Sequence, residues 1–525
     1  MPSARSSGLM AERTTGQPGS ASQAGSASQA GGRPIVGLRR GLGLVSATAT
    51  SVGLAFAAID YLAVVSVAAY VVGDSAWLAV LVAGFLALLV AAVFSELNGL
   101  YPSAAGIRLY MSKAMGAKTA LSVTFTYMTT IVLVIAADAF IIGAAIQHSL
   151  HEPPALAYLW IAVLVGIATV ANVMGVRMAG RLQDAVTYTV LASTVVLSLV
   201  AIFHVSKPFR TPFDLFGHGP HGAVEAIAFG VFIYAAFEWV TTTAEEVRTP
   251  SVTTKALFIA PGIMFVVMAL LAFAMGHAVP YHSAHGSPYP QLLLGRAALG
   301  EVGELWMLAT TVLTALNTFN GGFLTASRFI YAAARDDTLP RPFAKLNLKA
   351  VPWVAVVTLG SASLAVAALV FATHGWLLLV AVGSTLEAAI YACGCWCVLV
   401  LRSREDRERP FRLRFARPLT VAGLVIFALL GLASGLSDPS HPNRISGAPL
   451  GMVVAMGVLA TSYVWWVVPR LRAKALARAH AARPRRRPPR PEGAQASRPA
   501  SGSEALFEGP LGREPRQDEE GNEGP

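Results

Sequence analysis

Four acidic side chains interrupt otherwise apolar stretches of the sequence: Asp60, Asp138, Glu238 and Glu387. A charged side chain is costly in an apolar surrounding unless a partner compensates it, so such residues usually mark functional sites. No lysine or arginine can be placed in the middle of these stretches. An interior that holds only acids suits a cationic ligand, or a step that binds a proton or a metal ion. The alternative is that some of these acids lie near the ends of their stretches, in water.

The composition shows what surrounds these acids. Asp, Glu, Lys and Arg make up 13% of the 525 residues, and hydrophobic residues make up 54%. A typical soluble protein carries about 25% charged residues. This chain is therefore expected to be a polytopic membrane protein in a lipid bilayer. We expect no enzyme activity, because the sequence has no phosphate-binding GxxxxGK[ST] loop and no HExxH motif.

The three cysteines do not form a metal or disulfide site. They lie together in CGCWC as Cys393, Cys395 and Cys397. On a helix, the first and third share a face while the second points away, so they cannot converge on one ion. We expect no metal, no cofactor and no disulfide framework.

The net charge of +11 does not indicate nucleic acid, because the basic residues cluster beside apolar segments, where they act as topology signals. The basic run Arg483–Arg490 could contact anionic lipid or RNA. A solvated tail beside the membrane is the simpler interpretation, and we expect no nucleic-acid partner.

Crossing a bilayer takes about 20 apolar residues per helix. The sequence has twelve segments of this kind, which predicts an all-α polytopic membrane protein with twelve transmembrane helices. The expected spans are 42–71, 76–99, 119–147, 155–173, 185–203, 224–242, 256–278, 303–333, 353–372, 377–400, 418–437 and 448–469.

The loop charges predict the orientation. If the N-terminus is inside, the outer loops hold only Lys207, Arg210, Arg296 and Arg444, whereas every inner loop is basic. Positive residues favour the cytoplasmic side. We therefore expect a multi-pass protein of the cytoplasmic (plasma) membrane with both termini in the cytoplasm.

Two polar tails flank the apolar body. Residues 1–40 include the repeat SASQAG at 20–25 and 26–31, and are expected to form a disordered cytoplasmic tail because they cannot bury enough apolar surface. The transporter-like body is expected over 41–470. Residues 471–525, first basic and then acidic, are expected to form a second disordered cytoplasmic tail.

Three stretches resemble motifs of the amino acid-polyamine-organocation superfamily of transporters. They are SELNGLYPSAAGIRLYMSKAMG from Ser95 to Gly116, AFEWVTTTAEEVRTP from Ala236 to Pro250, and ASRFIYAAARDDTLPRPFAKL from Ala326 to Leu346. A smaller echo, LRSREDRERPFRL, lies at 401–413. The resemblance identifies the chain as similar to an amino acid permease over about residues 40–415.

The resemblance implies a five-plus-five inverted repeat, in which spans one to five correspond to spans six to ten. It also implies broken helices in spans one and six, with the substrate between them, where half-helix ends attract a carboxylate and free carbonyls bind an ammonium. The implied function is secondary active transport of amino acids or related organic amines by alternating access. The substrate-site residues that it implies are Gly53, Phe56, Ala57, Ala58, Ile59, Asp60, Phe232 and Tyr234.

The span-one loop departs from the family pattern. Gly53 matches, but the small G-S-G of the family is replaced by Ala57, Ala58 and Ile59, with Asp60 beside them. An acidic side chain there would repel an α-carboxylate. This motivates an alternative, a permease for polyamines or other amines without a carboxylate. Gly53 itself serves either as a hinge or as a packing glycine.

Charged residues in the family-like loops are expected to act in gating or coupling: Glu96, Asp138, Glu238, Glu245, Arg328, Arg335 and Glu387. Such charges can pair across loops in one conformation and separate in another, as alternating access requires. The alternative is static surface pairing.

Coupling to a proton or to sodium stays open at the sequence level. A lysine that some family members carry in span five falls near Val190 here, so proton coupling would need a carboxylate. Thr314, Asn317 and Thr318 offer oxygen ligands for an ion, or hydrogen bonds between helices. Symport, antiport, a homodimer, and a channel or non-transporting sensor on the same fold also stay open.

Overall fold

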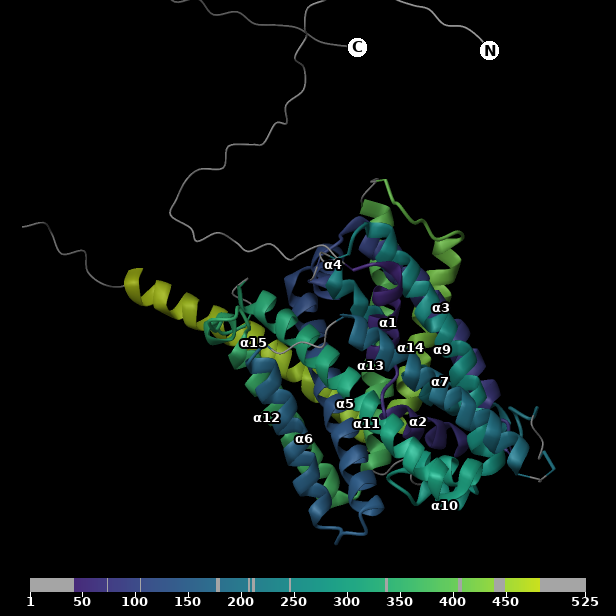
Figure 1. Cartoon of the computed structure of the whole chain (residues 1–525). Helices are drawn as coiled ribbons and strands as arrows, with labels where there is room; N and C mark the ends of the chain where they lie inside the picture. Colours follow the sequence, from purple (N-terminus) through teal and green to yellow (C-terminus); the bar gives the residue numbers. More distant parts are fainter. Residues whose placement is uncertain are drawn as a thin grey trace, which may run out of the picture. The chain divides into compact units, whose positions relative to one another are not determined.

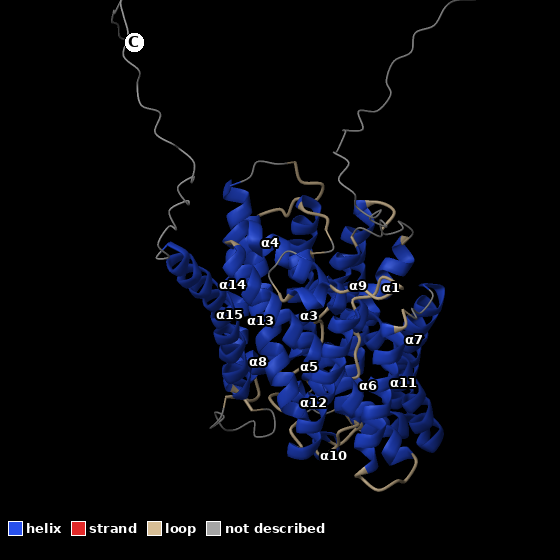
Figure 2. Ribbon diagram, turned by 90° about the vertical axis from the view of Figure 1, so that its left-hand side faces the viewer, coloured by secondary structure: helices blue, strands red, loops and turns tan. Residues whose placement is uncertain are grey.

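The computed structural model describes residues 42–481, except 73, 104, 176–179, 206–207, 210–212, 245–246, 336–338, 405–407 and 439–448. Within these ranges the chain is helical and has no strand (Figure 2). One isolated backbone bridge joins Leu42 to Val247. Residues 1–468 form one compact unit, and residues 469–525 form a second, in which only the end of the last helix is described.

The first five predicted spans correspond to six long or broken helices, with a further short helix in the loop after span two. They are α1 (Leu44–Ala55), α2 (Ile59–Ala68), α3 (Ala76–Leu100), α4 (Gly106–Met115), α5 (Ala117–Ser149), α6 (Leu156–Val173) and α7 (Gly180–His204).

The remaining predicted spans also correspond to helices. They are α8 (Gly219–Phe232) with the 3-10 helix η1 (Phe237–Thr243), α9 (Pro250–Ala278), α10 (Tyr281–His285), α11 (Pro290–Arg335), η2 (Arg341–Ala344), α12 (Trp353–Thr373), α13 (Trp376–Arg404), α14 (Ala416–Leu436) and α15 (Leu450–Ala481). Within α11, Leu299 and Gly300 are not helical, and Gly300 has a φ of 61°. Glycine adopts this conformation without penalty, so the spanning part of α11 begins after it.

Among the described residues, ten helices are long and apolar enough to cross a membrane, and the bent pair α1–α2 makes an eleventh. This confirms the prediction of an all-helical, multi-pass membrane protein. The twelfth predicted span corresponds to α15, whose described apolar part, Leu450–Trp465, is shorter. The count of twelve and the domain boundaries stay predictions. α15 ends at Ala481, beyond residue 470, where the body was expected to end.

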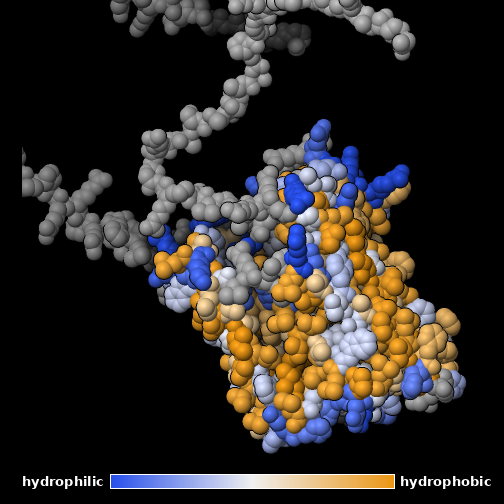
Figure 3. Space-filling model, viewed as in Figure 1, coloured by the Kyte–Doolittle hydropathy of each residue, from blue (hydrophilic) through white to orange (hydrophobic). Residues whose placement is uncertain are grey.

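Burial separates central from peripheral helices. The most apolar stretch is 83% buried in α5 and in α13 and 89% buried in α8–η1, but only 17% buried in α6. Figure 3 shows apolar side chains over the middle of one face of the molecule and hydrophilic side chains toward its two ends. A lipid-facing belt would have this distribution, and the central helices are the ones that can hold a site away from lipid.

The two halves of the body share an order of elements. Each half starts with an interrupted helix and continues with a long helix, a short helix and another long helix: α1–α2, α3, α4 and α5, then α8–η1, α9, α10 and α11. The short helices α4 and α10 lie at opposite ends of the unit (Figure 1). Halves inserted in opposite orientations would give this arrangement, which supports the inverted repeat as a prediction.

Candidate functional site

Span one is interrupted at Phe56–Ala58, between α1 and α2, whose axes differ by 58°. α1 ends because Phe56 takes an extended conformation (φ −84°, ψ 95°), while its N–H still donates to the carbonyl of Val52 at 2.7 Å. Every side chain from Phe56 to Asp60 is at most 3% exposed. Non-helical backbone at membrane depth is tolerated only where protein or a cavity surrounds it. The interruption therefore belongs to the interior of the bundle.

Gly53 does not form the hinge. It lies inside α1, where a Cβ atom would come within 2.9 Å of Thr187 Oγ1 and 3.3 Å of Asn317 Nδ2. The missing side chain lets α1 approach α7 and α11 closely. Of the two roles that the sequence left open for Gly53, the structure shows packing, and the hinge lies three residues later.

Two carboxyl groups cap the N-terminal end of α2. Asp60 accepts a hydrogen bond from the backbone N–H of Ala57 at 3.0 Å. Asp138, on α5, accepts one from the N–H of Ile59, also at 3.0 Å. Both carboxyl groups are buried. The first N–H groups of a helix lack partners within the helix and carry partial positive charge, so acidic side chains stabilise this end.

Span six is interrupted between Phe232 and Phe237. Ala236, in the middle, has a φ of 71°, which is rare for a residue other than glycine and often occurs at functional sites. The hydroxyl of Ser51, on α1, donates to the carbonyl of Phe237 at 2.7 Å. This bond joins the first half of broken span one directly to the interrupted region of span six. The family resemblance implied that these two interruptions lie side by side around the substrate.

The aromatic residues of span six are held by neighbouring helices. Phe232 packs against Gly383 of α13, where an added Cβ atom would overlap the ring. The hydroxyl of Tyr234 donates to the carbonyl of Val80 on α3 at 3.0 Å. Both side chains are buried. Their expected roles at the substrate stay predictions, because these contacts also suit core packing.

Glu238 lies in η1 and accepts hydrogen bonds from two tyrosines. Tyr127, on α5, donates to Oε1 at 2.6 Å, and Tyr391, on α13, donates to Oε2 at 3.3 Å. Tyr391 also reaches the carbonyl of Tyr234 at 3.4 Å. The interrupted span six is thus fixed between α5 and α13 by hydrogen bonds to an acidic side chain.

Glu387 lies one turn before Tyr391 on α13, beside Glu238. Its side chain is fully buried, and neither carboxyl oxygen makes a hydrogen bond of acceptable distance and angle, although Glu238, Tyr391 and the N–H of Ala236 lie close to it. Polar groups in protein interiors are nearly always hydrogen-bonded, so an exception needs an explanation. No lysine or arginine of the described residues forms an ion pair with either glutamate. Two neighbouring acids without a cation can take up a proton or a cation.

The polar residues of α11 make bonds within and between helices. Thr314 and Thr318 each donate to the carbonyl four residues earlier, and Asn317 donates to Thr187 of α7 at 2.9 Å. These contacts show the hydrogen-bonding role that the sequence left open, and ion binding by the same oxygens stays a prediction. The Oδ1 atom of Asn317 is buried without a partner.

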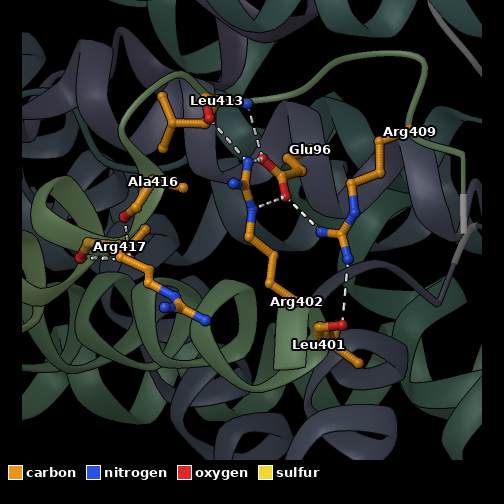
Figure 4. A network of polar contacts seen from close by, with 8 residues as sticks. Glu96, Leu401, Arg402, Arg409, Leu413, Ala416 and Arg417 are labelled. Atoms are coloured by element: carbon orange, nitrogen blue, oxygen red, sulfur yellow. Dashed lines mark hydrogen bonds and ion pairs between the residues drawn. The ribbon is translucent and has the colours of Figure 1, made fainter. Parts of the chain in front are cut away.

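At the end of the unit where α4 lies, Glu96 is surrounded by cationic partners (Figure 4). Its two oxygens accept from Arg402 Nε at 2.7 Å, Arg402 Nη2 at 2.6 Å and Arg409 Nη1 at 2.5 Å. The N–H of Leu413 adds a fourth bond at 2.9 Å. Charge-assisted bonds of this kind are the strongest in proteins. Glu96 therefore ties α3 to the end of α13 and to the segment that follows it.

The structure gives no polar contact between Glu96 and the other gating residues expected in the loops, Arg328 and Arg335, among the described residues. Arg328 is half-buried on α11, and Arg335 is exposed at its end. Glu245 lies outside the described residues. A shared gating role for these charges stays a prediction.

Sequence reasoning did not single out several residues of this site. Arg402 and Arg409 lie within the family-like stretch LRSREDRERPFRL, which indicates a notable loop but does not identify the acid that pairs with it. Tyr391 follows Glu387 by four residues, which places both on one helix face. Ser51 and Tyr127 had no such signal, because an isolated hydroxyl in an apolar span usually bonds within its own helix.

Comparison with known proteins gives a consistent result. The family model described as amino acid permease matches residues 47–474. An uncharacterized amino acid permease of Bacillus subtilis is 25% identical over 55% of this chain and 67% of its own length. The gamma-aminobutyric acid permease of the same organism is 26% identical over 54% and 63%. A vacuolar cationic amino acid transporter of Arabidopsis thaliana is 28% identical over 70% and 64%. The matched region thus spans about two thirds of the length of each of these relatives.

Solved structures with the same fold include the manganese transporter of Eremococcus coleocola. The match covers 84% of this chain and 99% of that one, with a TM-score of 0.54 and 14% sequence identity. At this level of identity the likeness concerns the fold alone.

Proposed function

Because this chain belongs to the amino acid permease family, we propose that it is a secondary active transporter that moves amino acids across a membrane by alternating access. The observation that carries the proposal is the buried meeting point of two interrupted helices, joined by the Ser51–Phe237 hydrogen bond and bordered by four carboxyl groups. Broken helices at membrane depth offer the backbone groups that bind a charged solute.

The substrate would bind near Phe56–Asp60 and Phe232–Tyr234. Relatives are named for gamma-aminobutyric acid, cationic amino acids and aromatic amino acids, which all carry an amino and a carboxyl group. This variety supports amino acids as the substrate class. It does not favour an amine without a carboxylate, nor a channel or a sensor.

Coupling to a proton is the second part of the proposal. Glu238 and Glu387 are fully buried neighbours, and no lysine or arginine of the described residues forms an ion pair with either. An ionised carboxylate without a partner is costly in such a place, so a proton taken up from one side and released to the other compensates the charge. Because η1 is part of the interrupted span six, a change at Glu238 reaches the substrate region directly.

Orientation in the plasma membrane is also a proposal. The end of the unit at which α4 lies carries Arg108, Lys113, Lys118, Arg402 and Arg404. Basic residues favour the cytoplasmic side. This supports a cytoplasmic location for that end and, with an even number of spans, for both termini.

Gradient-driven uptake tests the proposal. The purified full chain is placed in liposomes and given labelled alanine, leucine, phenylalanine, gamma-aminobutyric acid, lysine and arginine, with an inward proton gradient, an inward sodium gradient or no gradient. We expect accumulation of at least one amino acid with the proton gradient. Glu387→Gln should abolish gradient-driven accumulation but allow exchange of internal for external substrate.

The matched control is Glu304→Gln. Glu304, on α11, pairs with Arg296 and His148, whose side chains are both partly exposed, so this variant should accumulate substrate normally. Absence of accumulation under every gradient would contradict transport. Accumulation by Glu387→Gln at the normal level would contradict the coupling role alone.

A further inference from the structure

The N-terminal end of α2 is occupied by the protein's own carboxyl groups. The N–H of Ala57 donates to Asp60, the N–H of Ile59 donates to Asp138, and the N–H of Ala58 also lies beside Asp138. Ala57 and Ala58 precede α2 and Ile59 begins it, so these three N–H groups belong to the interruption and the start of the helix. A substrate carboxylate that bound there would have to displace two carboxyl groups held at 3.0 Å.

Asp138 has binding capacity left. Its Oδ1 accepts from Ile59, but Oδ2 makes no hydrogen bond of acceptable distance and angle, and the residue is 0% exposed. The N–H of Ala58 and the hydroxyl of Thr318 also lie within reach of this carboxyl group, although Thr318 donates its hydroxyl to the carbonyl of Thr314. A buried acceptor oxygen without a partner is unusual and indicates that another group completes it.

The local charge favours a cation. Two carboxyl groups face a helix end that carries only about half a positive charge. Within the described residues, no lysine, arginine or histidine forms an ion pair with Asp60 or Asp138. When these carboxyl groups are ionised, they repel a second anion strongly at low dielectric, whereas they attract an ammonium or guanidinium group.

The two carboxyl groups also determine which positive group of an amino acid can bind beside them. In a neutral amino acid, the α-ammonium and the carboxylate share one carbon atom, so a carboxylate would enter this acidic region together with the ammonium. In lysine or arginine, the side-chain cation lies several bonds from the carboxylate. The cation can then reach Asp138 while the carboxylate stays outside the acidic region.

We infer that Asp138 binds the side-chain cation of the substrate at Oδ2. Asp60 and Asp138 also occupy the backbone N–H groups at the start of α2, so a substrate carboxylate cannot bind there. The protein therefore selects cationic amino acids. The inference rests on the proposed function and adds the substrate class. Asp138 thereby becomes a specificity-determining residue.

The test compares lysine with norleucine, its uncharged analogue, and cadaverine, its analogue without a carboxylate. Each competes with labelled lysine for uptake into liposomes that contain the full chain or the variants Asp138→Asn and Asp138→Glu. We expect lysine to compete at least tenfold better than norleucine and cadaverine. Asp138→Asn should weaken lysine at least tenfold and leave norleucine unchanged, and Asp138→Glu should restore part of the preference. Asp214→Asn, the same change in the loop before α8, is the matched control.

Three results would overturn the inference: norleucine competing as well as lysine in the natural chain, an equal loss for both ligands in Asp138→Asn, or cadaverine competing better than lysine. The first and third need no variant, so the inference stays testable if Asp138→Asn does not fold. Binding of labelled lysine to the detergent-solubilised protein separates the two proposals. Lysine-selective binding without uptake would refute transport and support this inference. Uptake of neutral amino acids only would support transport and refute this inference.

Discussion

Replacing Glu96 with glutamine should destabilise the protein strongly. Glu96 is fully buried and accepts four hydrogen bonds, three of them from the guanidinium groups of Arg402 and Arg409. Glutamine keeps the shape but turns one acceptor oxygen into an NH₂ donor, which faces a guanidinium or the N–H of Leu413. Two cations would then share one neutral oxygen.

The size of the effect follows from burial. Removing one partner of a buried ion pair costs about 3–5 kcal/mol, because the other charge is left without compensation. Arg409 is only 6% exposed, but Arg402 is 18% exposed and can be partly hydrated. We therefore expect the lower end of that range, about 3 kcal/mol. Glu304→Gln, whose partner Arg296 is 62% exposed, should cost less than about 1 kcal/mol.

Unfolding in mixed micelles with increasing SDS, followed by tryptophan fluorescence, measures both variants against the natural chain. The double variant Glu96→Gln/Arg409→Gln should be more stable than Glu96→Gln by about 1 kcal/mol, because it removes one of the two cations that Glu96 accepts from. A loss below about 1 kcal/mol in Glu96→Gln, equal to that of Glu304→Gln, would refute the reasoning and mean that water screens this cluster.

The remaining predictions concern the interrupted helices. Tyr127→Phe removes the 2.6 Å bond to Glu238 and should cost about 1.5–3 kcal/mol in the same unfolding assay, whereas an unchanged stability would mean that the bond is not made in the membrane. Gly383→Ala places a methyl group against the ring of Phe232 and should cost about 1–3 kcal/mol and lower uptake, while Gly457→Ala, where an added Cβ atom meets nothing within 4 Å, should be neutral in both assays. Asp60→Ala removes the acceptor for the Ala57 N–H and should cost about 1 kcal/mol, and Asp60→Asn should cost clearly less.

The sequence predicts the helices well because the membrane sets their length. Span 119–147, for example, corresponds to α5 (Ala117–Ser149), and span 353–372 corresponds to α12 (Trp353–Thr373). Apolar length is a local property of the chain, so no knowledge of packing is needed. The interruptions of spans one and six are expected from the family resemblance as a whole, although the span-one loop itself departs from the family pattern.

The exact place of an interruption is less predictable. From the sequence, Gly53 could serve either as a hinge or in packing, and α1 continues through it to Ala55. The decisive interactions are the hydrogen bonds of Asp60 and Asp138 to the start of α2, and Asp138 lies 79 residues beyond Ile59 in the chain. Only the packing of α5 against the interruption brings them together.

Long-range charge pairs escape prediction for the same reason. Glu96 and Arg402 are separated by 306 positions, and many basic residues in the inner loops are equally plausible partners from the sequence. The pairing depends on how α3 and α13 pack. Composition and motifs can therefore identify a charged loop as important without naming its partner.

Counterflow is the most direct test of carrier transport through the two interrupted helices. Liposomes that contain the full chain are loaded with an unlabelled amino acid and diluted into a trace of the same labelled amino acid, without any ion gradient. A carrier that works by alternating access should accumulate label transiently above its equilibrium level, because outward movement of unlabelled substrate returns empty sites to the labelled side. Label that rises smoothly to equilibrium without an overshoot, or does not enter at all, would contradict transport by this mechanism.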